Sequence, residues 1–179
     1  MLFDLLIKSG TVVSHTGTGV ADVGMREGRI VAIGDLDSDR AANVVDASGL
    51  HVLPGLIDTQ VHFREPGMEQ AEDLESGTRG AVLGGITGLF EMPNTKPLTT
   101  TPAAIADKLK RAENRAWCDH AFYIGATAEN AADLAEWERT PGCCGVKVFM
   151  GASTGDLLVP DAETLTRVLA SGSRRVAIH

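Results

Sequence analysis

The stretch VLPGLIDTQVHFREPG, residues 52–67, marks the point at which the chain changes character. Before it, short runs rich in valine and isoleucine are separated by glycines and show no helical period. After it, apolar runs of strand length alternate with segments of helical length, as in a parallel sheet with helical crossovers. We therefore predict a small β-rich module at residues 1–53 and an α/β unit at residues 54–179.

The second unit contains apolar runs of strand length with helical segments between them. The expected strands are 55–62, 86–91, 119–124, 143–150 and 174–179, and the expected helices lie near 69–84, 102–116, 128–138 and 161–171. Thr101 followed by Pro102 is suited to begin the second of these helices, because a capping hydroxyl precedes a proline in the first turn. Thr127 and Asp161 can cap the two helices that follow.

This order of elements fits two architectures, a doubly wound sheet and a (β/α)8 barrel, and periodicity does not choose between them. A barrel needs eight strands and about 250 residues. In that case the 179 residues hold only part of one. The last expected strand runs to the final residue, so we expect the sequence to be a fragment of a longer chain.

The first 53 residues contain three β-prone segments: LLIKSGTVV, VADVGMREGRIVAIG and NVVDASGLHVL. We expect a small antiparallel sheet here. Glu27-Gly28, which lies between two apolar runs, is a plausible hairpin turn.

Composition is typical of a soluble cytoplasmic protein, with 44% hydrophobic and 22% charged residues. A net charge of −8 without a basic patch predicts binding to neither nucleic acid nor an anionic membrane surface. No apolar run approaches the roughly 20 residues that cross a bilayer. The N-terminus also lacks the basic segment of a signal peptide. Cys118, Cys143 and Cys144 are odd in number and two are adjacent, so we expect free thiols rather than disulfides.

Polar side chains gather at the end of the first strand of the α/β unit. Alternation along a strand places Asp58, Gln60 and His62 on one face, and Arg64 continues the same parity. Barrel enzymes build their active sites at the C-terminal ends of strands. A solvated strand end followed by the turn residues of Glu65-Pro66-Gly67 is the other interpretation.

Three later strands also end in candidate residues: Asn94, Lys147 and His179. Lys147 lies among apolar neighbours, where burial lowers the pKa of an amine and frees it for covalent chemistry. Simpler roles are open for each residue, namely a turn hydrogen bond for Asn94, an amine that reaches solvent for Lys147 and an isolated histidine for His179. The remaining histidines are expected to be structural or at the surface: His15, His51 and His120.

Three motifs together resemble the amidohydrolase superfamily, and dihydroorotases most closely. They are VLPGLIDTQVHFREPG (52–67), EMPNT (91–95) and GVKVFMGAS (145–153), followed by AIH (177–179). The resemblance implies a partial (β/α)8 TIM barrel, of which about five strands are present, beside a small N-terminal β-sandwich. It also implies a homo-oligomeric enzyme of pyrimidine biosynthesis that reversibly hydrolyses the cyclic amide of dihydroorotate to N-carbamoyl-L-aspartate.

The resemblance also implies a role for each candidate residue. His62 matches the second histidine of a metal-binding His-x-His pair, and His179 matches a ligand of a second metal. Lys147 matches the lysine that CO2 converts to a carbamate in a site of one or two zinc ions, where it can bridge two metals. Arg64 and Asn94 match residues that hold the substrate carboxylate. In the family, further ligands lie on later strands, so we expect residues 1–179 alone not to hydrolyse dihydroorotate.

The sequence departs from the family pattern at Gln60, which occupies the position of the first histidine of the pair. A neutral amide oxygen is a poor replacement for imidazole at zinc. Zinc could bind with Gln60 or water in that place, fill only the second position, or not bind. The last case describes a non-catalytic homologue that acts as a structural subunit. Another cyclic amidohydrolase, an allantoinase or hydantoinase, is a further alternative, for which Arg64 has less use.

Overall fold

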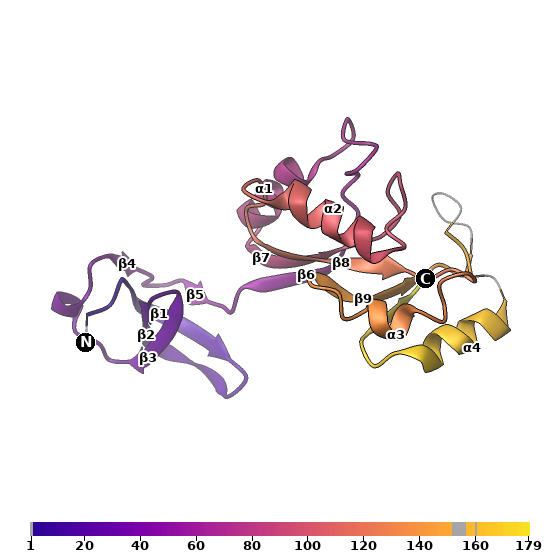
Figure 1. Ribbon diagram of the computed structural model, residues 1–179. Coiled ribbons are helices and arrows are strands. Elements are labelled where there is room, and N and C mark those ends of the chain that lie inside the picture. Colours follow the sequence, from indigo (N-terminus) through magenta and orange to yellow (C-terminus); the bar gives the residue numbers. More distant parts are fainter. Residues whose placement is uncertain (1, 152–156, 160) are drawn as a thin grey trace. The chain divides into compact units, whose positions relative to one another are not determined.

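The computed structural model describes residues 2–151, 157–159 and 161–179. The chain divides into two compact units, Met1–Pro54 and Gly55–His179 (Figure 1). The end of the GVKVFMGAS motif, from residue 152, lies outside the described residues.

The first unit is a single sheet in which β1 (Leu5–Ser14), β2 (Gly17–Arg26) and β3 (Arg29–Gly34) are antiparallel. Glu27 and Gly28 both have positive φ, at 51° and 72°. The two-residue hairpin turn is therefore confirmed. The expectation of a wholly antiparallel sheet is wrong, because β4 (Val44–Asp46) and β5 (His51–Val52) pair with β1 in parallel. A short 3-10 helix, η1 (Ser38–Arg40), lies between β3 and β4.

The second unit is a curled parallel sheet that belongs to the α/β class. Its strands are β6 (Leu56–Val61), β7 (Ile86–Glu91), β8 (Asp119–Gly125), β9 (Cys143–Val148) and β10 (Val176–Ile178). The helices that connect them are α1 (Leu74–Leu83), α2 (Pro102–Ala112), α3 (Leu134–Trp137) and α4 (Ala162–Ser171). Neighbouring strands follow sequence order, β10-β9-β8-β7-β6. A doubly wound sheet reverses its order at a switch point. This sheet does not, and it is therefore part of a (β/α)8 barrel.

Local sequence explains where most of the helices begin. Asp73 forms a reciprocal capping box with Ser76 at the start of α1. Thr101 accepts a hydrogen bond from the Ala104 backbone at 3.2 Å, and Asp161 accepts one from the Thr164 backbone at 2.7 Å. The capping predictions for Thr101 and Asp161 are confirmed. The prediction for Thr127 is wrong, because α3 begins after Asp133.

The helix expected at 128–138 is reduced to the four residues of α3. Thr127 and Asn130 bond each other reciprocally, at 2.8 and 3.2 Å. The Asn130 amide also donates to the carbonyls of Thr100 and Gly125. These bonds hold turns where the helix was expected, and they explain why the prediction is wrong before Leu134.

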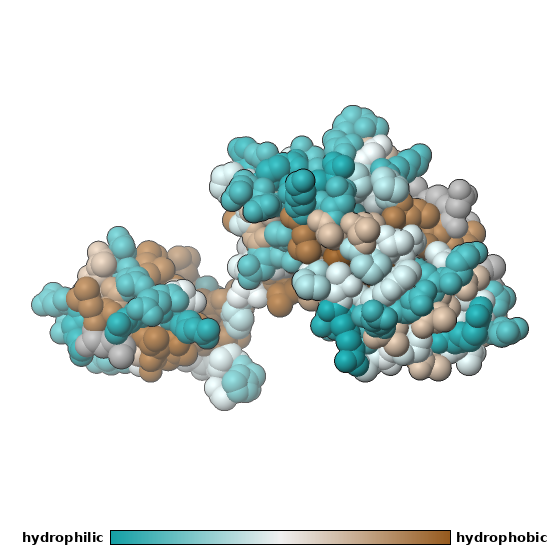
Figure 2. Space-filling view, in the orientation of Figure 1, coloured by the Kyte–Doolittle hydropathy of each residue, from teal (hydrophilic) through white to brown (hydrophobic). Residues whose placement is uncertain are grey.

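The buried core lies between the sheet and its helices. Phe122, Ile124, Val146 and Val148 belong to it, together with Ile105 from α2. Figure 1 shows the helices on the outer side of the curled sheet, and Figure 2 shows a mostly hydrophilic outer surface over α1 and α2. None of the helices in the described ranges is long and apolar enough to cross a membrane.

Candidate active site

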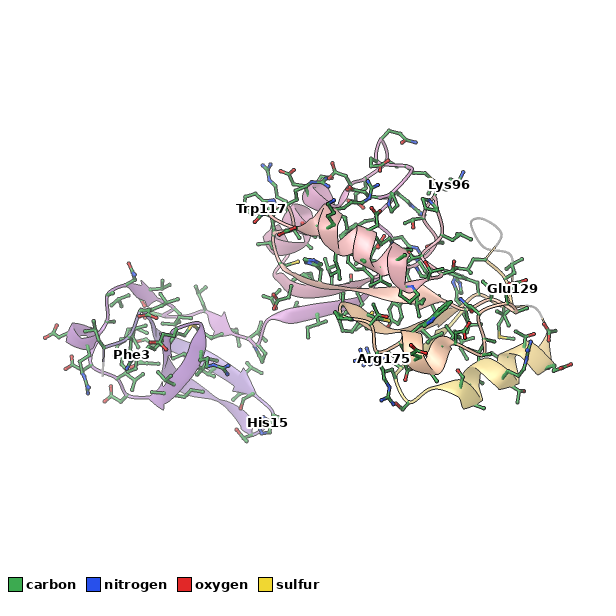
Figure 3. All side chains as sticks on the ribbon, in the orientation of Figure 1. Phe3, His15, Lys96, Trp117, Glu129 and Arg175 are labelled. Carbon is green, nitrogen blue, oxygen red and sulfur yellow. The ribbon has the colours of Figure 1, made fainter. Side chains whose placement is uncertain are left out.

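The inner face of the sheet is defined by the strand register. Gly125 of β8 pairs with Lys147 of β9, and Lys147 pairs with Ala177 of β10. Ile124 and Val146, which come directly before Gly125 and Lys147, belong to the core between the sheet and the helices. Because side chains alternate along a strand, Gly125 and Lys147 face the opposite, inner side. Figure 3 shows Lys96 and Glu129, on the loops after β7 and β8, on one side of the unit, and Trp117, which precedes β8, on the opposite side.

His179 continues the pairing beyond β10. Its backbone N–H donates to the Val148 carbonyl at 3.0 Å, and its own carbonyl accepts from the Met150 N–H at 2.7 Å. Ala177, the partner of Lys147, faces inward. His179 lies two residues after Ala177 and therefore faces the same side. The imidazole of His179 lies 6.2 Å from the Phe149 ring, between centroids.

Strand β6 does not alternate without a break, as the sequence had suggested. Asp58 pairs with Leu89 and Val61 pairs with Glu91, so β6 advances by three residues while β7 advances by two. The extra residue is a bulge that reverses the parity of the strand. The expectation that Asp58 shares a face with Gln60 and His62 is therefore wrong. Gln60 is exposed, and its backbone N–H donates to Asp58 Oδ1 at 2.9 Å.

Lys147 is buried on this inner face, with 1% of its surface exposed. Its Nζ lies 4.8 Å from the centroid of the Phe149 ring. Among the described residues its side-chain amine has no carboxylate partner and no hydrogen bond. Burial lowers the pKa of the amine. A larger fraction of Lys147 is therefore neutral and nucleophilic than in an exposed lysine.

His62 lies at the same end of the sheet, and its Nδ1 is 2.9 Å from the Asn94 Oδ1. Burial lowers the pKa of His62, and the Asn94 hydrogen bond opposes this shift. The nearby charges of Arg64, Lys147 and His179 lower it further. The structure therefore brings together His62, Arg64, Asn94, Lys147 and His179. The half-buried guanidinium of Arg64 has no ion pair or side-chain hydrogen bond within the described ranges.

Glu65, which the sequence suggested was a turn residue, anchors the loop after β6. Glu65 is 3% exposed. It accepts two hydrogen bonds from the Arg115 guanidinium, at 2.8 and 3.1 Å, and one from the Leu74 backbone at 3.0 Å. The Lys96 N–H donates to the Pro66 carbonyl at 2.9 Å, which joins this loop to the loop after β7. An acidic residue beside a proline gives no signal of a partner 50 positions away.

A buried ion pair supports the loop after β7 from the helix side. The Lys108 amine, on α2, donates to Glu91 and to the Met92 carbonyl. Glu91 Oε1 has no partner in the described residues. Burial raises the pKa of Glu91 to about 7, and the Lys108 charge opposes that shift.

The donor set limits how a metal could be held. Within the described ranges, no three His, Cys, Asp or Glu side chains converge on one point. His62, His179 and Lys147 are the candidate ligands that the sequence offers for a zinc ion at this place. A lysine can ligate zinc at neutral pH only after it loses its positive charge, as a carbamate does. With that change the set reaches the three protein ligands that are typical of catalytic zinc.

The Amidohydrolase family matches residues 51–151 of the chain. The allantoinases of Escherichia coli O1:K1 and of strain ED1a are each 41% identical over 157 residues, which is 87% of this chain and 34% of the relative. The chain thus spans about a third of the length of the curated relatives it matches.

Two solved structures have the same architecture. L-hydantoinase (dihydropyrimidinase) from Arthrobacter aurescens has a TM-score of 0.88 and 30% identity over 99% of this chain and 41% of its own. D-hydantoinase from Bacillus sp. AR9 has a TM-score of 0.81 and 32% identity over 98% of this chain and 39% of its own. These relatives favour the allantoinase and hydantoinase alternative over dihydroorotase.

Proposed function

The chain belongs to the amidohydrolase family, and from this we propose that the protein hydrolyses a ring amide bond of a cyclic ureide such as allantoin or hydantoin. The observation behind the proposal is the buried Lys147 amine, which has His62 and His179 near it where parallel strands end. Relatives named for allantoin and hydantoin supply the substrate class.

We further propose that Lys147 is carboxylated. Its neutral amine would attack CO2, form a nitrogen–carbon bond and release a proton, which leaves an anionic carbamate. With His62 and His179 this group would hold one or two zinc ions. Bound zinc polarises a substrate carbonyl and lowers the pKa of a water molecule so that hydroxide is available near neutral pH.

The polar groups around Lys147 would orient the substrate. Arg64 presents several N–H donors in a fixed plane, which suits the carbonyl oxygens of a ureide ring. Gln60, at the family's first histidine position, would weaken the first metal position, because its amide oxygen is a poorer zinc ligand than imidazole.

Dihydroorotate is the second candidate substrate, and one observation favours it. Arg64 has no ion-pair partner among the described residues, and a guanidinium is suited to bidentate binding of a carboxylate. Dihydroorotate has a carboxylate, whereas allantoin and hydantoin rings do not.

The test compares ring opening of allantoin, hydantoin and dihydroorotate by the purified full-length parent protein with zinc and bicarbonate present, because residues 1–179 alone are expected to be inactive. Lys147→Ala should abolish turnover, and Lys110→Ala, which changes an exposed lysine of α2, should leave it unchanged. Activity of Lys147→Ala within twofold of the parent protein would reject the proposed role of Lys147. A parent protein inactive on all three substrates would favour the non-catalytic homologue.

A further inference from the structure

Asn94 makes a contact that its expected role in holding a substrate carboxylate does not require. Only 6% of its surface is exposed, and its Oδ1 lies 2.9 Å from His62 Nδ1. A carbonyl oxygen accepts hydrogen bonds and cannot donate them. The proton of this bond therefore belongs to His62 Nδ1. In the neutral ring, Nε2 then has an unprotonated lone pair.

The loop around Asn94 holds the amide in one place. The Thr95 and Thr99 backbone N–H groups both donate to the Pro93 carbonyl at 2.9 Å. The Thr95 hydroxyl donates to the Pro97 carbonyl at 2.9 Å. A tight turn with these internal bonds leaves the Asn94 side chain little freedom to turn away from His62.

The same loop is fixed to the segment that contains His62. The Lys96 N–H donates to the Pro66 carbonyl at 2.9 Å. Gly67 packs so closely on Lys96 that an added Cβ would lie 2.1 Å from the Lys96 carbonyl oxygen. Asn94 and His62 therefore lie on two loops that are joined by direct contacts, which favour a stable hydrogen bond between them.

We propose that Asn94 is a positioning residue that fixes His62 in the Nδ1–H tautomer and so presents Nε2 for a metal ion. Imidazoles that bind metals usually donate their other ring N–H to a neighbouring acceptor, which sets ring orientation and tautomer. The inference rests on the proposed function in one respect, since it takes zinc as the ion. It replaces the carboxylate-binding role, for which allantoin and hydantoin offer no group.

The first measurement is the tautomer of His62 in the metal-free protein, read from two-bond ¹H–¹⁵N spectra after labelling of histidine nitrogen. His62→Gln identifies the signals. The parent protein and Asn94→Asp, which keeps an acceptor oxygen, should show the Nδ1–H form. Asn94→Leu should lose it. An Nε2–H form of His62 in the parent protein overturns the proposal, and this result does not depend on whether the Asn94 variants fold.

The second measurement is zinc affinity. Removing a neighbour that orients a ligand typically costs 10–100-fold in metal affinity, so Asn94→Leu should lose about that factor and Asn94→Asp should restore most of it. Asn130→Leu is the matched control, because Asn130 is a buried amide that bonds backbone carbonyls of Gly125 and Thr100. An equal loss in Asn130→Leu would overturn a specific role for Asn94.

The tautomer and zinc affinity are both read without turnover, so they separate the two proposals. The Nδ1–H form in a protein inactive on all three substrates would uphold the role of Asn94 and reject the enzymatic function. An active protein with the Nε2–H form would do the reverse.

Discussion

Arg115→Met tests whether Glu65 anchors the loop that follows His62. The substitution keeps most of the aliphatic stem and removes the guanidinium that donates to both Glu65 carboxylate oxygens, at 2.8 and 3.1 Å. Glu65 is then a buried carboxylate with one remaining bond, from the Leu74 backbone. A buried charge that loses its partner destabilises the folded state. We therefore expect a lower free energy of unfolding.

The size of the loss follows from the contacts. A hydrogen bond to a charged group contributes about 1.5–3 kcal/mol, so two set an upper range of about 3–6 kcal/mol. The Arg115 side chain is 35% exposed, and water screens part of its charge. Arg111 Nη1 also lies 3.7 Å from Glu65 Oε1 and can compensate in part. We expect a loss of about 2 kcal/mol.

Urea denaturation of the purified protein measures this loss. Arg139→Met, which changes an exposed arginine without a side-chain contact in the described residues, is the matched control. A double-mutant cycle with Glu65→Gln should give a coupling energy above about 1 kcal/mol. If Arg115→Met and Arg139→Met are equally stable, Glu65 is not held by Arg115, and the account of this loop is wrong.

Three further substitutions test other parts of the structure. Gly67→Ala should lower the free energy of unfolding in urea and lower kcat/KM, because Gly67 has φ +97 and its Cβ would meet the Lys96 carbonyl at 2.1 Å; unchanged values would refute the close packing of the loops. Gln60→His should raise the zinc content measured by mass spectrometry, since it restores an imidazole ligand, and an unchanged content would show that Gln60 does not limit metal binding. Burial raises the pKa of Asp22, but hydrogen bonds, first from Lys8, outweigh this and lower it from 3.8 to about 2. A lowered carboxylate pKa stabilises the fold above about pH 4, and this stability is lost as pH falls toward 2. Asp22→Asn should therefore lower the free energy of unfolding by about 2 kcal/mol at pH 7 and make it depend less on pH between about 4 and 2. An unchanged pH dependence in this range would contradict the pairing of Asp22 with Lys8.

The sequence predicted most of the second unit because its signals are local. The strand expected at 86–91 is β7, with the same bounds, and two helices begin at their expected caps. The helix at 128–138 failed because its turns depend on the Asn130 amide, which bonds carbonyls from two other segments. Helical spacing within a segment contains no information about such partners.

In the candidate site, too, local features could be predicted from sequence and tertiary contacts could not. The sequence located His62 and Lys147 near the ends of strands, because the order of strands along the chain can be read from sequence alone. The bulge in β6 was not readable, because it is defined by the register with β7. The bond between Asn94 and His62 spans 32 positions and also depends on tertiary structure.

The motifs that suggested dihydroorotase are largely occupied with holding loops. In HFREPG, Glu65 binds Arg115. The Pro66 carbonyl accepts a hydrogen bond from the Lys96 N–H, and Gly67 packs against Lys96. In EMPNT, Asn94 binds His62. These residues hold the two loops together. Enzymes that act on different ring substrates can share this arrangement of loops. The Arg64 side chain has no ion pair or hydrogen bond among the described residues, and we propose that it contributes to substrate choice. Arg64→Ala should therefore raise KM for dihydroorotate far more than for allantoin, as steady-state kinetics on both substrates can measure. Equal effects on the two would mean that Arg64 does not read a carboxylate.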